Sequence, residues 1–417
     1  MTSATVGARS ARAGAPRGVA GLLHAWLERP LSSYYLLLGS AGLLVALGLV
    51  MVLSASSVTS YASSGSSFTI AEKQAMWVAV GLPAMWVGMH LPVRAYRWLG
   101  YPLLIGAVSL LVLVLVPHVG VNVAGATRWI ALPGGLQVQP SELAKLALVL
   151  WGADLLARKE KRLRDVRHLL VPLVPLTLFM ALLVMMQPDL GTTTVLLIIM
   201  LALLWTAGSP VSVFTAIGMF VGAGGGLLAV TEPYRLARLT GFTNPCAVAK
   251  AQDLGYQACQ GLFALSSGGW FGLGLGASRE KFGYLPNQYT DYIFAIIGEE
   301  LGLLGTMTVL VLFAVLGFAG IRIAQRCPDR FSQLAAAGVT AWLMGQGLVN
   351  MGAVVGLLPI TGIPLPMVSF GGSALVPTLF ALGMLASFAR REPTAAKALA
   401  ARRRNRRGVL ARVARGA

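Results

Sequence analysis

The sequence predicts an all-α protein: a polytopic bundle of about ten transmembrane helices. Its composition is the first reason, because 56% of the 417 residues are hydrophobic and only 12% are charged, whereas soluble domains are about a quarter charged. The second reason is that apolar runs approaching the ~20 residues needed to span a bilayer recur along the chain. These runs lie near residues 33–54, 74–91, 99–117, 141–157, 168–186, 190–208, 211–230, 291–318, 333–357 and 373–389.

Basic residues predict the orientation of the bundle, because Lys and Arg collect in cytoplasmic loops. They are concentrated in the arm before the first run, in alternate linkers and in the tail. All these segments fall on one side if the chain crosses ten times, so both termini are expected in the cytoplasm. This rule also accounts for the net charge of +18 without nucleic acid as a partner. The expected parts are a basic arm (1–32), a membrane domain (33–389) and a basic tail (390–417), the tail lying disordered against anionic lipid headgroups.

The predicted outer loops differ from these linkers. The 55–72 loop is rich in serine and is expected to be flexible. The 231–290 loop, between the seventh and eighth runs, is much longer than a connection requires, and long loops are often functional. It carries basic residues on the side where the orientation rule disfavours them, which points to an anionic ligand outside the membrane. These residues are Arg235, Arg238, Lys250, Arg279 and Lys281.

Two cysteines, Cys246 and Cys259, also lie in this loop. An extracytoplasmic compartment is oxidising and favours a disulfide between them, with two free thiols as the alternative. The sequence shows no cluster of metal ligands, so no metal site is predicted.

Polar groups within apolar runs are costly and are candidates for function. Glu142 and Lys145 are three residues apart and share a helix face, either as a structural ion pair or at the border of a polar cavity. Gln187 and Asp189 interrupt two apolar runs at a tight turn, where Asp189 can cap the following helix or line a cavity.

Three carboxylates mark the start of the eighth run. Asp291 opens it, and either Thr290 or Asp291 can serve as a helix cap. Capping does not explain Glu299 and Glu300, which lie deeper in the same helix and can bond to neighbouring helices. The 352–373 segment, which includes Ser369, holds too many prolines and glycines for a regular span. It is expected to form a re-entrant or surface loop that contacts lipid or a lipid-linked substrate.

These segments together resemble a known family. The motifs are GATRW from Gly125, QPSELAK from Gln139, QPDLGTT from Gln187, GLGLGAS from Gly272 and TDYIFAIIGEELG from Thr290, followed by PITGIPLP and SFGGS. In this order they resemble the SEDS proteins (shape, elongation, division and sporulation) over roughly residues 33–390. The LFALSSGGW and ASREK stretches resemble the septal, FtsW-type branch most, and the elongation, RodA-type branch shares most of the motifs.

The resemblance implies a glycosyltransferase that polymerises lipid II into glycan strands at the outer face of the inner membrane, at the division septum. It implies a class B penicillin-binding protein and other divisome membrane proteins as partners, besides lipid II, the nascent glycan and membrane lipids. The family's essential aspartate falls on Asp291.

On this reading Asp291 is a general base, and basic residues stabilise the departing diphosphate. The candidates for diphosphate binding are Lys281, Arg235, Arg128, Arg238 and Arg279. Glu142, Lys145, Gln187, Asp189, Glu299, Glu300 and Ser369 are the candidates for a polar cavity. A divalent cation bridging the diphosphate is an open expectation for which the sequence offers no ligands.

Three alternatives stay open at this point. A lipid II flippase would also use many spans, intramembrane acids and broken helices. A RodA-type elongation polymerase would share the chemistry. A catalytically silent scaffold would tolerate Asp291→Asn.

Overall fold

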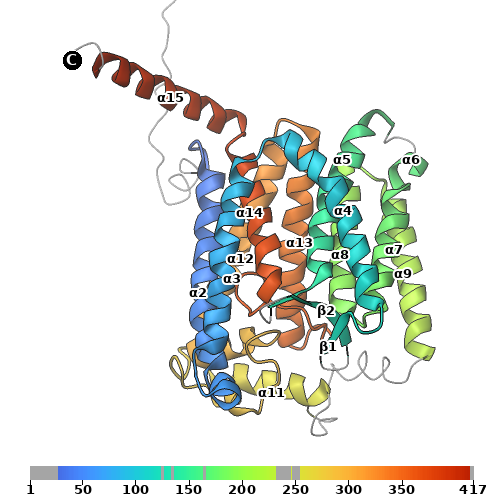
Figure 1. Ribbon diagram of the computed structural model, residues 1–417, viewed down its shortest axis with the longest axis vertical. Coiled ribbons are helices and arrows are strands. Elements are labelled where there is room, and N and C mark those ends of the chain that lie inside the picture. Colours follow the sequence, from blue (N-terminus) through green and yellow to red (C-terminus); the bar gives the residue numbers. More distant parts are fainter. Residues whose placement is uncertain are drawn as a thin grey trace, which may run out of the picture.

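The computed structural model describes residues 27–123, 126–132, 136–162, 166–231, 246 and 254–413, and within these it is mostly helical. Figure 1 shows long helices running side by side along one axis. Those before the large loop are α2 (Ser32–Ser64), α3 (Thr69–His90), α4 (Val93–Leu115), α5 (Pro140–Arg158), α6 (Val166–Leu170), α7 (Leu173–Met185), α8 (Leu190–Ala207) and α9 (Val211–Thr231). Those from the loop onward are α11 (Leu254–Ser267), α12 (Ile293–Arg326), α13 (Arg330–Val354), α14 (Leu375–Ala389) and α15 (Pro393–Val413).

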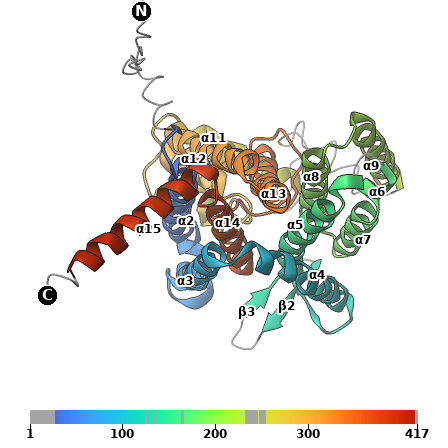
Figure 2. The ribbon, with the colours of Figure 1, turned by 90° about the horizontal axis from the view of Figure 1, so that it is seen from above.

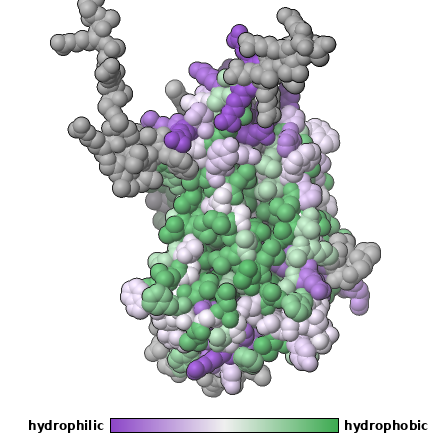
Figure 3. All heavy atoms as spheres, turned by 90° about the vertical axis from the view of Figure 1, so that its left-hand side faces the viewer, coloured by the Kyte–Doolittle hydropathy of each residue, from purple (hydrophilic) through white to green (hydrophobic). Residues whose placement is uncertain are grey.

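Among the described residues, five segments are long and apolar enough to cross a membrane: α2, α4, α8, α12 and Gly372–Ala389, which contains α14. The hydrocarbon core of a bilayer requires such helices because their backbone groups are all bonded internally. In Figure 3, hydrophobic side chains form a band across the side of the bundle, with hydrophilic residues nearer both ends. The chain is therefore an integral membrane protein. Helices also occupy the other predicted runs, but the number of crossings remains a prediction.

The two ends of the bundle differ. In Figure 1 the start of α2 and helix α15 lie at one end, whereas α11 and a small sheet lie at the other. Figure 2, viewed along the bundle, shows α15 projecting beyond it. We call the end that carries the sheet and α11 the outer end, following the predicted orientation.

Three local expectations were wrong. The fold is not purely helical, because β1 (Gly120–Val123), β2 (Ala126–Leu132) and β3 (Leu136–Val138) form an antiparallel sheet with the order β1-β2-β3. The expected 55–72 loop is largely helix, since α2 continues to Ser64 and serine hydroxyls bond back to its own carbonyls. The expected disordered tail forms α15, which begins with proline at its first position and an alanine-rich turn, both favourable to helix.

Helix α12 is broken nine residues after its start. Gly302 has φ 67° and ψ −162°, a conformation open almost only to glycine. A loop segment replaces the interrupted helical hydrogen bonds: the amides of Leu273 and Gly274 donate to the carbonyls of Glu299 and Glu300 at 2.9 and 3.0 Å. Beyond the break, the amide of Leu303 donates to Gly269 at 2.9 Å. Main-chain groups of the 269–274 segment thus stabilise α12 on both sides of the break.

We expect Gly302→Ala to lower the free energy of unfolding by about 1–3 kcal/mol, since a non-glycine residue at such a dihedral costs that much. The new Cβ would also lie 2.6 Å from the carbonyl oxygen of Trp270. The measurement is thermal unfolding in detergent. Gly106→Ala is the control, because Gly106 lies within α4 and its Cβ would meet no atom within 4 Å. Equal midpoints for the two variants would contradict the account of the break.

Candidate active site

Asp291 lies at the outer end of the bundle, two residues before α12 begins at Ile293. It is half-buried. It does not cap α12, because the N-cap position is Tyr292 and no side chain caps this helix. The helix-cap explanation of this carboxylate is therefore wrong, and the side chain is available for another role.

The loop between α13 and α14 packs against Asp291. Gly362 lies beside the carboxylate, such that a Cβ on it would be 3.8 Å from Oδ2 of Asp291 and 3.9 Å from Nη1 of Arg128. The Phe370 amide, in the same loop, donates to the carbonyl of Tyr289 at 2.9 Å. The 352–373 segment is irregular from Val355 to Gly371, as its prolines and glycines predict.

Arg128 reaches this place from strand β2. Its Nε donates to the carbonyl of Gln187 at 3.1 Å, and its Nη2 donates to the carbonyl of Pro188. These two bonds fix the guanidinium at the turn between α7 and α8. The third nitrogen, Nη1, points to Gly362, next to the Asp291 carboxylate.

Asp189 caps α8, as its place in the sequence suggests. Its Oδ1 accepts from the amide of Thr192 at 3.0 Å, and its Oδ2 accepts from the Thr192 hydroxyl at 2.8 Å and from Nε2 of Gln139 at 3.2 Å. The helix start is close to the α13–α14 loop, since a Cβ on Gly191 would lie 2.6 Å from the carbonyl oxygen of Thr361. Arg128, Asp189 and Asp291 therefore gather although they are far apart in sequence.

Burial raises the pKa of Asp291 from 3.8 to about 6, because desolvation disfavours the carboxylate. Arg128 opposes the rise in this pKa, and the negative charge of Asp189 adds to it. A carboxyl group with a pKa near 6 is ionised at neutral pH and is basic enough to accept a proton in a transition state.

The buried ion pair of Lys145 and Glu142 is connected to the α13–α14 loop through Gln346. Nζ of Lys145 lies 2.8 Å from Oε1 of Glu142 and donates to Oε1 of Gln346 at 2.8 Å. Nε2 of Gln346 donates to the carbonyl of Pro364 at 2.9 Å. Both Lys145 and Glu142 are nearly inaccessible to solvent, and this chain of bonds connects α5, α13 and the loop.

A second polar cluster lies where α12 is broken. The Ser278 hydroxyl donates to Oε2 of Glu299 at 2.5 Å, and the Arg279 amide donates to its Oε1 at 2.8 Å. Nζ of Lys281 lies 3.5 Å from Oε1 of Glu300 and is buried. This cluster anchors the outer loop to α12. Lys281, a predicted diphosphate contact, is thus paired with Glu300 in this structure.

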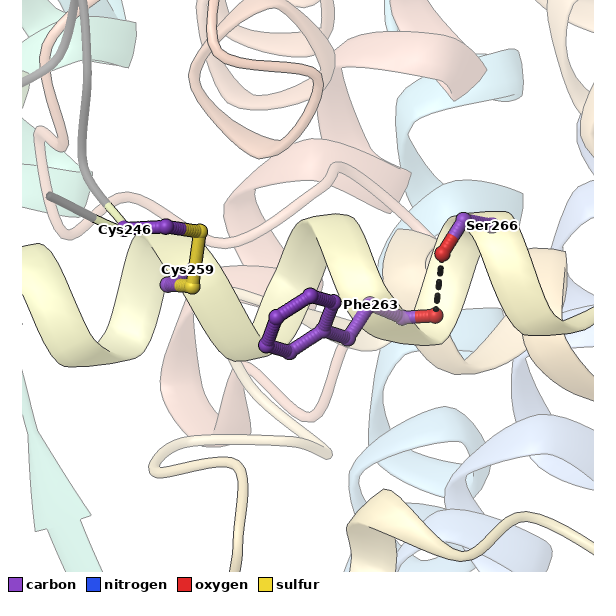
Figure 4. Close-up of a disulfide and its surroundings, with 4 residues drawn as sticks. All are labelled: Cys246, Cys259, Phe263 and Ser266. Carbon is purple, nitrogen blue, oxygen red and sulfur yellow. Dashed lines mark hydrogen bonds between the residues drawn. A yellow bond between two sulfur atoms is a disulfide. The ribbon is translucent and has the colours of Figure 1, made fainter.

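The remaining predicted residues lie as follows. Ser369 is inside the α13–α14 loop, where its hydroxyl accepts from the Leu365 amide at 2.8 Å. The Gln187 side chain is buried and donates to the carbonyl of Leu111 at 3.2 Å. Cys246 and Cys259 form a disulfide that ties α11 to the preceding chain (Figure 4). Arg235 and Arg238 lie outside the described residues. Within the described ranges no three His, Cys, Asp or Glu side chains gather as a metal site.

Sequence reasoning missed Asn350 and Gln346 on α13. Nδ2 of Asn350 donates to the main-chain carbonyls of Asp291, at 2.7 Å, and of Ile363, at 2.8 Å. The signal was present, because two amides four residues apart within an apolar run share a helix face and are costly in a membrane.

Comparison with known proteins shows the family to which the chain belongs. The family model described as "Cell cycle protein", which covers FtsW, RodA and SpoVE, matches residues 34–393. The chain belongs to this family. It is 44% identical over 389 residues to "Probable peptidoglycan glycosyltransferase FtsW" of Mycobacterium tuberculosis, covering 93% of this chain and 74% of that one. It is 39% identical over 348 residues to "Stage V sporulation protein E" of Bacillus subtilis, covering 84% and 94%.

Two solved structures are similar in fold. One, described as "Structural coordination of polymerization and crosslinking by a peptidoglycan synthase complex", aligns with a TM-score of 0.70 at 29% identity, over 86% of this chain and 97% of that one. The other, the RodA rod-shape-determining protein of Thermus thermophilus, aligns with a TM-score of 0.61 at 28% identity, over 88% and 99%. The membrane bundle is therefore the fold of this family.

Proposed function

We propose that this FtsW-family protein is a peptidoglycan glycosyltransferase that polymerises lipid II, with Asp291 as its general base. The observation that carries the proposal is the half-buried Asp291 carboxylate beside Arg128 at the outer end of a membrane bundle. The relatives named as peptidoglycan glycosyltransferases support the reaction class.

In the proposed reaction, Asp291 accepts the proton of the sugar 4-hydroxyl of an incoming lipid II. The hydroxyl oxygen forms a bond to the anomeric carbon of the growing strand. The bond from that carbon to the diphosphate oxygen breaks, and undecaprenyl diphosphate leaves with the electron pair. The configuration is inverted. One carboxylate is sufficient, because a diphosphate leaving group does not need the acid that glycosidases supply with a second carboxyl.

Arg128 is the proposed partner of the diphosphate. Its guanidinium is held by two carbonyls and its Nη1 lies at the site, so its orientation is fixed before the substrate binds. Fixed cations placed where negative charge develops supply a large part of many rate enhancements. Arg235, Arg238 and the exposed Arg279 remain further candidates from the outer loop.

The proposal includes the predicted topology: ten spans over 33–389, both termini in the cytoplasm, residues 231–290 outside, and the inner membrane at the septum as location. The positions of the basic linkers support this orientation. A class B penicillin-binding protein is the proposed partner, and the fold shared with a complex for polymerization and crosslinking supports it.

The experiment that tests the function separates polymerisation from transport. Purified protein in detergent, with its penicillin-binding partner, is given labelled lipid II, and released undecaprenyl diphosphate is counted. Polymerisation releases it and transport does not. Translocation of fluorescent lipid II in proteoliposomes without any release would replace the proposal by the flippase.

The proposed base predicts how the rate depends on pH. Since Asp291 must be ionised, kcat/KM should rise about tenfold per pH unit below pH 6 and level off above it. A carboxyl group with the ordinary aspartate value of 3.8 would place this limb two units lower. The measurement is the initial rate of diphosphate release at low substrate concentration from pH 4.5 to 8. A flat profile from pH 5 upward would exclude a base with this pKa.

A further inference from the structure

The two hydrogen bonds of Asn350 join the proposed base to the loop that covers it. Both hydrogens of its amide nitrogen are used, one for the carbonyl of Asp291 at 2.7 Å and one for the carbonyl of Ile363 at 2.8 Å. Two carbonyl acceptors also fix the orientation of the amide, because a flipped amide would direct its oxygen at them. The side chain is buried, with only 3% of its surface exposed.

This arrangement leaves the other end of the amide without a partner. Oδ1 of Asn350 is buried and accepts no hydrogen bond from the described residues. A buried acceptor without a partner is destabilising. If Asn350 is removed, the main-chain carbonyls of Asp291 and Ile363 lose this hydrogen-bond donor, which is also destabilising. The amide therefore serves Asp291 and Ile363, not the general stability of α13.

The two hydrogen bonds of Asn350 act on the position of Asp291 relative to Arg128 and to the α13–α14 loop. Ile363 follows Gly362, which lies beside both Oδ2 of Asp291 and Nη1 of Arg128. One helical turn earlier, Gln346 holds Pro364 and is itself held by Lys145 and by Nε1 of Trp342 at 3.0 Å. Asn350 and Gln346 thus hold the loop at Ile363 and Pro364. Asn350 also holds the main chain of Asp291.

We infer that Asn350 is a positioning residue: it sets where the Asp291 carboxylate stands relative to Arg128 and to the α13–α14 loop. The inference rests on the proposed function, since it assigns the base its support. Asn350 does not touch the reacting atoms. Its loss allows the start of α12 to move away from the loop, and a displacement of about 1 Å can cost 10²-fold in rate.

The test uses two variants and a control on the same helix. Asn350→Leu keeps the size and loses both donors, and Asn350→Asp keeps the shape. Thr340→Val is the control, because Thr340 is buried in α13 and, among the described residues, its hydroxyl bonds to the carbonyl of Ala336 in the same helix, at 2.7 Å. All are purified in detergent with their unfolding midpoints recorded.

We expect both Asn350 variants to lose about 10–10²-fold in kcat with KM within about twofold of wild type, because binding contacts stay. We also expect the acid limb of kcat/KM to move below pH 6 in Asn350→Leu, as Asp291 becomes more solvated. The control should keep the wild-type kcat and limb. Wild-type kcat in either Asn350 variant, or an unmoved limb in Asn350→Leu, would overturn the inference. Equal losses in Thr340→Val would overturn it too.

Hydrogen–deuterium exchange gives a readout that does not depend on activity. Amide exchange in the segment 287–297 should rise in the Asn350 variants and not in Thr340→Val. If wild type proves inactive on lipid II while this exchange difference is present, the proposed function fails and the positioning role stands. Unchanged exchange in both variants would remove the positioning role, whatever the wild-type activity.

Discussion

Asp291→Asn should reduce the rate of diphosphate release from lipid II by at least ~10²–10⁴-fold, the range that general-base assistance supplies. Asparagine has nearly the same size but cannot accept the proton. The two bonds that Asn350 makes to main-chain carbonyls are unaffected by the change, so the local fold should persist. The measurement is the initial rate of release by purified protein at neutral pH.

Asp329→Asn is the matched control for this variant. Asp329 is the N-cap of α13, where its carboxylate accepts from the Ser332 amide at 2.9 Å. Asparagine caps a helix about as well as aspartate does, so this variant should keep the wild-type rate. An Asp291→Asn protein that folds and retains a rate within tenfold of wild type would mean that the base is another group.

Arg128→Ala should reduce kcat/KM by about 10²–10³-fold, the usual effect of removing one fixed group that stabilises developing charge. Its loss should also raise the pKa of Asp291 further, because the positive charge of Arg128 opposes the effect of burial on this pKa. The acid limb of the pH profile should therefore move above pH 6. Arg128→Lys should recover little, since a lysine cannot replace a guanidinium held at two nitrogens.

Arg330→Ala is the control for the loss of an arginine. Arg330 also donates to a main-chain carbonyl of another helix, that of Thr206 at 2.8 Å, and to the Gln333 side chain. It begins α13 at the end opposite Asn350. In this control, kcat/KM and the position of the acid limb should both stay at their wild-type values. If Arg128→Ala lowered kcat/KM without moving the acid limb of the pH profile, Arg128 would lie away from the base during the reaction.

The sequence predicted the bundle because a membrane span is a local property. Twenty apolar residues such as those of α2 or α8 have few alternatives in a bilayer. The apolar runs coincide with helices, although α2 continues to Ser64, beyond the predicted end at residue 54. Asp291 was singled out for a related reason: a carboxylate at the start of an apolar run stands out, and the motif resemblance fell on it.

The parts that were missed depend on contacts between distant segments. The break at Gly302 requires the carbonyl and amide partners of the 269–274 segment, which no helical pattern reveals. The short strands of the sheet depend on pairing across it. Arg128 lies near Asp291 because β2, the α7–α8 turn and the α13–α14 loop come together in the folded chain. The pairing of Lys281 with Glu300 also appears only in three dimensions.

The length of glycan strands made by purified protein tests the central claim most directly. Wild type and Asp291→Asn, shown to unfold at the same temperature, are incubated in detergent with labelled lipid II and the penicillin-binding partner, and the products are separated on a gel. We predict a ladder of strands from wild type and unreacted lipid II alone from Asp291→Asn. Ladders of the same length from both proteins would contradict Asp291 as the base.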